Sequence, residues 1–284
     1  MTDDDSTTTD LTIRLGGDTP VHRLGFGAMR LTGWNRTDGP PNGIEIARRA
    51  LDLGVTLIDT ADSYAIGANE ELLAEALHPY PADLVIATKA GQSRPGRDSW
   101  VPLGRPEYLH QQAELSLRRL KVECIGLYQL HRVDPAVPLA DQVGVLDDLR
   151  RAGKVRHVGL SEVTVEQIRE AQEVTRIDSV QNLYNLDERQ HDDVLAYCEA
   201  QDIAFLSWKP INYGNPGTTS GAVATVAAEF GASQVQIAIA WLLARSGATV
   251  PIPGTSSIEH LEENWQAANI HLEPAHLDML GERG

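Results

Sequence analysis

Short apolar runs and longer amphipathic segments alternate along most of the chain. From residue 24 onward, runs of four to six residues rich in Val, Ile and Leu have the length and composition of buried strands. Each run is followed by a longer segment in which apolar and polar positions are mixed. Eight strands are predicted in this way, at 24–28, 56–59, 84–88, 125–130, 155–160, 179–182, 204–207 and 248–251.

Helical periodicity marks several of the intervening segments. In 139–151 the apolar residues recur at i, i+3 and i+4, which places them on one face of a helix. The same spacing predicts a helix over 238–245. A third helix is predicted within 161–168, where Thr164 and Gln167 have the spacing of a capping box.

Eight strands that alternate with helices predict parallel pairing through right-handed crossovers. We therefore expect the α/β class and a closed (β/α)8 TIM barrel, as a single domain over 11–284. Two short strand-like segments flank Gly16-Gly17-Asp18, which predicts an N-terminal β-hairpin that caps the bottom of the barrel. Residues 1–10 are acidic and polar and are expected to form a disordered tail. The segment 91–105, rich in Gly, Pro and Arg, is expected to be a long loop.

Composition narrows the choice of partners. The net charge is −16, which opposes binding to nucleic acid and to anionic lipid. No apolar run approaches the ~20 residues that cross a bilayer, and the first residues lack the features of a signal peptide, so a cytoplasmic protein without a membrane partner is expected. Cys124 and Cys198 lie beside apolar residues and are expected to be buried, reduced thiols. The oligomeric state is not indicated by the sequence.

Three successive predicted strands end in residues with reactive side chains. Asp59 ends the second strand, Lys89 the third and His131 the fourth, and Tyr64 follows Asp59 after a short loop. A barrel brings these strand ends together on the face where such proteins carry their active sites. An ammonium group near a phenol lowers the pKa of the phenol, so Lys89, paired with Asp59, is expected to ready Tyr64 for proton donation. This group of residues suits the reduction of a carbonyl, with a hydride arriving at carbon and Tyr64 protonating oxygen.

The same residues lie in motifs that resemble those of the aldo-keto reductase family. The matching segments, in family order and spacing, are LIDTADSY, IATKA, LYQLH, VRHVGLS, SVQNLYN and IPGTSSIEHLEEN. The resemblance covers nearly the whole chain after the tail. It implies that Tyr64 is the general acid, that Lys89 and Asp59 tune it, and that His131 orients the carbonyl of a small-molecule substrate.

The resemblance also implies a nicotinamide cofactor, with NADP(H) preferred and NAD(H) possible. Residues 25–30 contain only two of the glycines of a dinucleotide fingerprint, as expected for a family that binds the cofactor across the strand ends. Hydroxyls and free N–H groups at the start of a helix near 254–261 form a natural anion site, with Ser256 and Glu259 as a capping box. The implied cofactor contacts are Ser161, Gln181, Trp208, Lys209, Pro210, Gly254, Thr255, Ser256, His260, Glu263 and Asn264.

Two departures from the family pattern concern this cofactor. The family usually has Asn where this chain has Glu162, and a carboxylate cannot donate as an amide does. The role of Glu162 is therefore left open. Many members use a lysine and an arginine for the 2′-phosphate, where this chain has Gly254 and His260. We therefore expect weak discrimination against NADH.

Other functions remain as alternatives. Lys89 or Lys209 in a barrel suits the Schiff base of a class I aldolase. Some relatives in the family sense the cofactor without efficient turnover. A metal-dependent hydrolase is disfavoured because the nine histidines are scattered without ligand spacing, so no metal is expected.

The substrate pocket is expected to be open, because the long C-terminal loop of steroid-reducing members is missing. Trp34, Trp100 and Tyr213 are candidates for its walls. Aromatic walls suit a flat or apolar aldehyde, including a pyridoxal-like ring.

Overall fold

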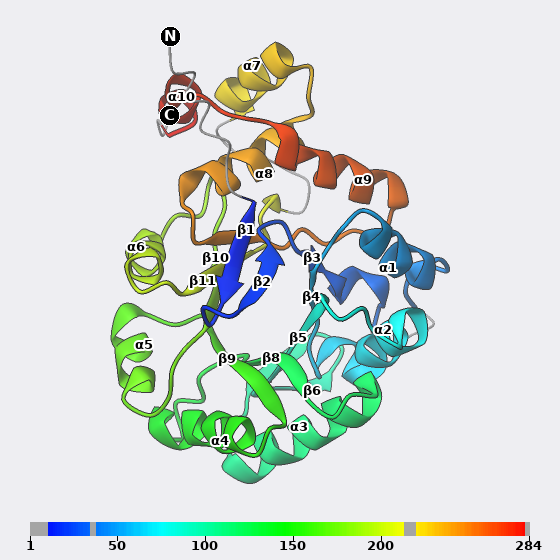
Figure 1. Cartoon of the computed structure of the whole chain (residues 1–284), viewed down its shortest axis with the longest axis vertical. Coiled ribbons are helices and arrows are strands. Elements are labelled where there is room, and N and C mark those ends of the chain that lie inside the picture. Colours follow the sequence, from blue (N-terminus) through cyan, green and yellow to red (C-terminus); the bar gives the residue numbers. More distant parts are fainter. Residues whose placement is uncertain (1–10, 35–37, 213–219, 282–284) are drawn as a thin grey trace.

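Eight parallel strands form the centre of the computed structural model, which describes residues 11–34, 38–212 and 220–281 (Figure 1). The strands are hydrogen-bonded in the order β12-β11-β10-β9-β8-β5-β4-β3. All eight predicted strands are confirmed, although the first has only two residues. Their bounds are β3 Phe26–Gly27, β4 Leu57–Asp59, β5 Val85–Ala90, β8 Ile125–Leu130, β9 Val155–Ser161, β10 Ser179–Leu183, β11 Ala204–Trp208 and β12 Thr249–Pro251.

Backbone hydrogen bonds between the first and last strands bring the sheet round into a barrel. The amide of Gly25 donates to the carbonyl oxygen of Pro251 at 2.9 Å, and the amide of Gly27 donates to that of Pro253 at 3.2 Å. A Cβ atom on Gly27 would lie 2.8 Å from the Ile252 carbonyl oxygen, so only glycine allows this close approach. The predicted (β/α)8 barrel is confirmed.

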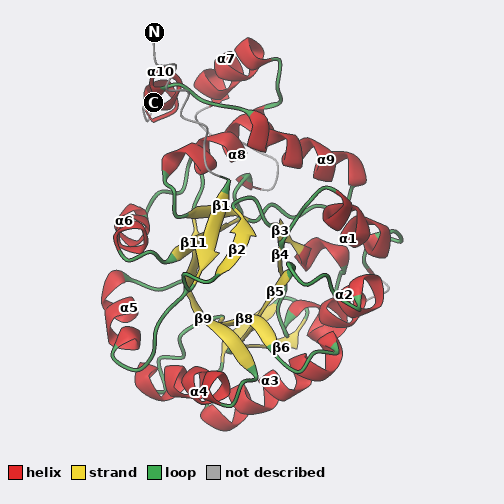
Figure 2. Cartoon of the chain, viewed as in Figure 1, coloured by secondary structure: helices red, strands yellow, loops and turns green. Residues whose placement is uncertain are grey.

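Helices surround the barrel, and α7 and α10 lie together at its rim beyond α8 (Figures 1 and 2). The predicted capping box of Thr164 and Gln167 is present at the start of α5, and a second one joins Ser233 and Gln236 at the start of α8. The helix bounds are α1 Gly43–Asp52, α2 Ala68–Leu77, α3 Pro106–Leu120, α4 Leu139–Arg151, α5 Val165–Gln172, α6 Asp192–Ala200, α7 Ser220–Phe230, α8 Gln234–Arg245, α9 Ile258–Gln266 and α10 Pro274–Gly281, with short 3-10 turns η1 Ala28–Leu31, η3 Tyr64–Gly67 and η5 Ala267–Asn269.

The predicted N-terminal hairpin consists of β1 (Thr12–Leu15) and β2 (Thr19–His22). Leu15 and Val21 pack into the interior of the barrel in one apolar cluster with side chains from β4, β5, β8, β11 and β12. The Thr19 hydroxyl lies 2.8 Å from Nε2 of His157, which is near the start of β9. The hairpin therefore closes the end of the barrel at which the strands begin.

Three expectations about local structure are wrong. The segment 91–105 is not a plain loop: β6 (Gln92–Gly96) and β7 (Ser99–Pro102) pair as an antiparallel hairpin, and their Gly and Pro residues hid this pattern. Cys124 is exposed, because it lies in the turn before β8, whereas Cys198 is buried as expected and both thiols are free. The helix α9 is capped by Ser257 and not by Ser256, so no capping box with Glu259 forms.

No single helix in the described part of the chain is long and apolar enough to cross a membrane, although α7 and α8 pass that test together across a 94° bend. Tyr213 and the expected acidic tail, residues 1–10, lie outside the described residues.

The capping box of α5 gives a test of the fold. Thr164 is exposed, so Thr164→Ala removes its hydrogen bond to the Gln167 amide without opening a cavity. We expect the free energy of unfolding, measured with urea, to fall by about 1 kcal/mol. Thr225→Ala, at an exposed position inside α7, is the matched control and should not destabilise the protein. Equal losses in the two variants would show that the cap contributes nothing.

Candidate active site

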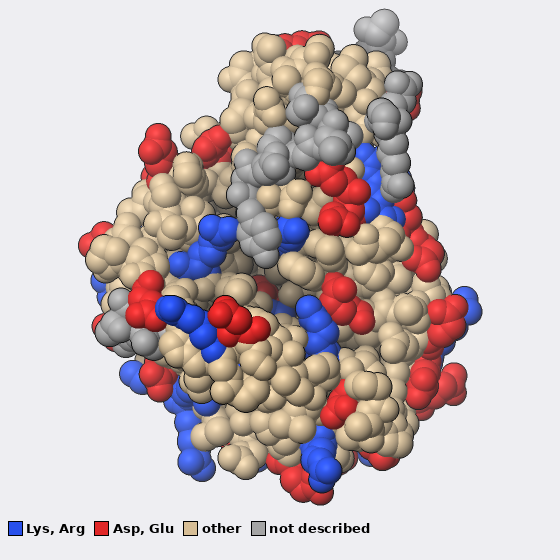
Figure 3. Space-filling model, turned by 180° about the vertical axis from the view of Figure 1, so that it is seen from behind, with Lys and Arg blue, Asp and Glu red and all other residues tan. Residues whose placement is uncertain are grey.

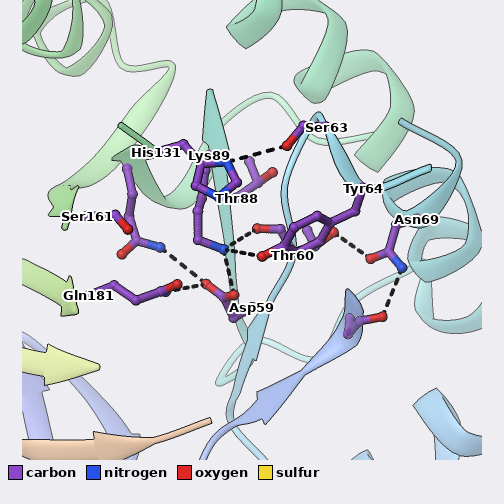
Figure 4. A network of polar contacts seen from close by, with 12 residues as sticks. Asp59, Thr60, Ser63, Tyr64, Asn69, Thr88, Lys89, His131, Ser161 and Gln181 are labelled. Carbon is purple, nitrogen blue, oxygen red and sulfur yellow. Dashed lines mark hydrogen bonds and ion pairs between the residues drawn. The ribbon is translucent and has the colours of Figure 1, made fainter. Parts of the chain in front are cut away.

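A buried ion pair lies at the strand ends opposite the hairpin (Figure 4). Nζ of Lys89, in β5, is 2.6 Å from Oδ2 of Asp59, the last residue of β4, and donates also to the Thr60 carbonyl oxygen at 2.9 Å. The Lys89 side chain is 0% exposed and that of Asp59 is 4% exposed. A charge with so little access to water requires a partner, and each residue supplies it for the other.

Tyr64 and His131 stand beside this pair, as the sequence predicts. Lys89 Nζ is 3.5 Å from the Tyr64 hydroxyl oxygen, a long contact in which the ammonium donates. The His131 ring meets the Tyr64 ring edge-on, with 5.9 Å between centroids, and its Nδ1 lies 3.4 Å from the Ser63 hydroxyl. The four predicted catalytic residues are therefore close together.

The backbone after Tyr64 is unusual. Ala65 and Ile66 have φ angles of 50° and 53°, in the left-handed region that residues other than glycine avoid. Asn69 holds the same loop, because its side chain donates to the Ala28 carbonyl oxygen at 2.9 Å and accepts from the Thr60 hydroxyl at 2.6 Å. Strained backbone that the surroundings hold in place is typical of functional sites.

The pKa shifts assign a protonation state to each group. Burial alone would lower the pKa of Lys89, but the Asp59 carboxylate and Tyr64 raise it above its ordinary value, so the ammonium stays charged. Burial, with the positive charges of Lys89 and Arg132, lowers the pKa of His131 well below 6.5, so the imidazole is neutral at pH 7.

Tyr64 differs from expectation. Burial raises the pKa of Tyr64 above 10.0, and Asp59 adds to this effect, whereas the Lys89 ammonium lowers the pKa by less. The predicted net decrease is wrong, because the sequence does not show how far the phenol is removed from water. Tyr64 is therefore fully protonated at pH 7.

A cavity of about 910 Å³ opens from these residues along the strand ends. Figure 3 shows this face, with a hollow near its centre bordered by side chains of both charges. Asp59, Tyr64 and His131 line the cavity, and Lys89 lies behind them. All the implied cofactor contacts line it as well: Ser161, Gln181, Trp208, Lys209, Pro210, Gly254, Thr255, Ser256, His260, Glu263 and Asn264.

The sequence reasoning missed several residues of this cavity. Met29 and Arg30 follow the first strand, whose end was not among the predicted site positions, and Arg132 directly follows His131. Gln129 was also missed: its amide, like that of Gln181, donates to Oδ1 of Asp59, at 3.2 and 2.8 Å. A polar residue inside the apolar run of strand four was the available indication.

The contacts of the Glu162 side chain explain its role. Its φ angle is 55°, and Oε1 accepts from the Trp208 indole N–H and from the Leu183 amide, both at 2.6 Å. Left-handed backbone tolerates Asn better than most residues, which suits the usual family residue. In this chain the longer carboxylate instead holds the Trp208 ring at the cavity wall.

Among the described residues, Trp100 is the one predicted pocket aromatic that lines the cavity. It projects from β7, and its ring centroid is 6.5 Å from those of both Tyr64 and His131. Trp34 is not in the cavity lining. The Arg94 guanidinium lies 4.8 Å from the Trp34 ring and 4.0 Å from the Trp100 ring.

Comparisons with known proteins agree with this arrangement. An uncharacterized oxidoreductase of Schizosaccharomyces pombe is 46% identical over 274 residues, covering 94% of this chain and 88% of the relative. Pyridoxine 4-dehydrogenase of Escherichia coli is 37% identical over 274 residues, covering 93% and 95%.

Among solved structures, the glycerol dehydrogenase of Gluconobacter oxydans matches with a TM-score of 0.87 at 27% identity, covering 95% of this chain and 94% of that one. An aldo-keto reductase of Klebsiella pneumoniae in complex with NADPH matches with a TM-score of 0.79 at 27% identity, covering 95% and 93%. The model of the aldo/keto reductase family matches residues 23–282. The chain therefore belongs to the aldo/keto reductase family.

Proposed function

We propose that this protein reduces an aldehyde or ketone to an alcohol, with NADPH as hydride donor and Tyr64 as proton donor. The observation that carries this proposal is the Tyr64 hydroxyl 3.5 Å from a fully buried, ion-paired Lys89 at the wall of a large cavity. When bound, the nicotinamide supplies the hydride. We expect the reaction to take place in the cytoplasm.

Each catalytic residue has one task in this proposal. Tyr64 hydrogen-bonds the carbonyl oxygen and gives it a proton as negative charge develops there. The Lys89 ammonium stabilises the phenolate that remains, and Asp59 keeps that ammonium charged. His131, as a neutral imidazole, donates a hydrogen bond that orients the carbonyl.

The cavity suits NADPH chemically. Trp208 offers an aromatic face for the nicotinamide, and Ser161 offers a hydroxyl for its carboxamide. At the far end, the α9 N-terminus and the hydroxyls of Thr255 and Ser256 suit a phosphate. The NADPH complex of the Klebsiella pneumoniae relative supports the same choice. Because Gly254 and His260 offer no fixed cation, we expect NADH to be used less well but measurably.

A class I aldolase that uses Lys89 is disfavoured by the state of this lysine. A Schiff base requires a neutral amine, whereas the pKa of Lys89 is raised and its ammonium is held 2.6 Å from Asp59. Trp100 beside Tyr64 and His131 favours a substrate with a flat ring. The likeness to pyridoxine 4-dehydrogenase supports the hypothesis of a substrate with a pyridoxal-like ring.

Replacing the proton donor tests the proposal directly. Tyr64→Phe should lower kcat with a panel of aldehydes by about 10²- to 10⁴-fold, followed by NADPH absorbance, because the proton is lost but the ring remains. NADPH binding, followed by fluorescence quenching, should persist. Tyr197→Phe, whose hydroxyl bonds Gln172 outside the barrel, is the matched control and should be fully active. Unchanged turnover in Tyr64→Phe would remove Tyr64 from this role. Cofactor binding without turnover of any aldehyde by the wild type would instead favour a cofactor-sensing function.

Removing the charges of the Lys89–Asp59 ion pair should affect stability and activity in different ways. Lys89→Met leaves Asp59 buried without a counter-ion and should lower the free energy of unfolding by about 3–5 kcal/mol. Lys89→Met combined with Asp59→Asn removes both charges and should recover much of this loss in urea unfolding. Both variants should remain inactive, because the phenolate has no ammonium beside it. Recovery of activity in the double variant would contradict the role of Lys89.

The pKa shifts predict the pH profile of reduction. The pKa of His131 lies below 6.5 and that of Tyr64 above 10.0, so both groups keep their neutral forms between these values. We expect kcat/KM to be level across this range, without an inflection at the ordinary pKa of histidine. Above pH 10 the unfolded chain binds fewer protons than the folded one, so the free energy of unfolding should fall as pH rises. A rate that halves near pH 6.5 would contradict a neutral His131.

A further inference from the structure

Arg132 lies in the active-site cavity but has no role in the proposed chemistry. It directly follows His131 at the end of β8 and lines the cavity with Tyr64 and Trp100. Its Nη1 donates to the His131 carbonyl oxygen at 2.6 Å and to the Ser161 hydroxyl at 3.1 Å. These contacts involve one of its three nitrogens and fix the guanidinium group at the cavity wall.

Within the described part of the chain, no carboxylate lies within 4.0 Å of the Arg132 guanidinium. Glu162 acts on Arg132 from a greater distance, and Oε1 of Glu162 already accepts from the Trp208 and Leu183 N–H groups. Arg119, by comparison, is paired with the buried Glu70 at 2.6 Å.

An arginine in this setting is suited to an anion that arrives with the substrate. Burial lowers the pKa of Arg132, but a guanidinium remains charged at neutral pH. The negative charge of Asp59 is offset by Lys89, so it does not repel an anion from this part of the cavity. The planar guanidinium presents paired N–H groups that match a carboxylate, and such bonds are among the stronger ones in proteins.

We propose that the substrate carries a carboxylate and that Arg132 binds it. The carbonyl then lies against Tyr64 and His131, and the hydrocarbon part against Trp100. The substrate class is therefore a flat aldehyde or ketone with an acidic group, and Arg132 determines this specificity. This inference rests on the proposed reductase function and adds the substrate class to it.

Pairs of substrates that differ only in charge test this assignment. 3-Carboxybenzaldehyde and 4-carboxybenzaldehyde are compared with their methyl esters, which keep the ring and the aldehyde but lack the negative charge. We expect the wild type to favour one of the acids over its ester by at least about tenfold in kcat/KM. Arg132→Gln should lower kcat/KM for that acid by about 10- to 100-fold, mainly through KM, and bring the ratio close to one. Arg132→Lys should give an intermediate ratio.

Arg97→Gln is the matched control for charge. Arg97 lies on the β6–β7 hairpin, pairs with Asp38 at 2.9 Å and is not among the residues of the cavity lining. It should keep the wild-type ratio of acid to ester. An equal change in Arg97→Gln would indicate long-range attraction of anions and overturn the assignment of a direct contact.

The remaining outcomes distinguish a failure of the role of Arg132 from a failure of the proposed reductase function. Turnover of the esters without a preference for any acid, or an Arg132→Gln ratio equal to that of the wild type, would overturn the role of Arg132 and leave the reductase proposal standing. A rise in the dissociation constant for NADPH as large as the rise in KM would show that Arg132 serves the cofactor. No NADPH oxidation with any of these aldehydes would overturn both proposals.

Discussion

The pairing of Lys89 with Asp59 is the interaction on which the site depends. A fully buried ammonium is costly unless an opposite charge meets it, and here one carboxylate does so while it accepts from Gln129 and Gln181. These residues belong to β4, β5, β8 and β10, so a single acid connects four strands. The barrel strands therefore fix the position of the Lys89 ammonium, and Asn69 holds the loop that brings Tyr64 to it.

The strands, the closing hairpin and the grouping of the candidate catalytic residues were predictable, because they depend on local pattern. An apolar run indicates a buried strand, and a charged residue at its end indicates the face of the barrel where the active site is expected. The hairpin of β6 and β7 was not predictable in this way, because Gly and Pro interrupt its alternation. The raised pKa of Tyr64 depends on burial by residues distant in the sequence, and the contact of Trp34 with Arg94 likewise joins residues that are far apart in the chain.

Glu162 shows how a carboxylate at a left-handed backbone position can hold a cavity wall. The left-handed conformation at the end of β9 directs the side chain along the strand ends, where a carboxylate reaches the Trp208 indole N–H. Trp208, the residue expected to face the nicotinamide, is therefore held in place by Glu162, which follows β9. Trp100 contacts the Arg94 guanidinium, so two aromatic rings of the cavity lining are held by charged neighbours.

The hairpin at the lower end of the barrel has a kinetic consequence. Because Leu15 and Val21 fill the interior, the described barrel offers no passage through its axis, and both reactants must use the same opening. In the proposed reaction, a dinucleotide laid across the strand ends would form part of the floor on which a small carbonyl compound rests. Turnover would then be sequential, with the dinucleotide binding first and leaving last.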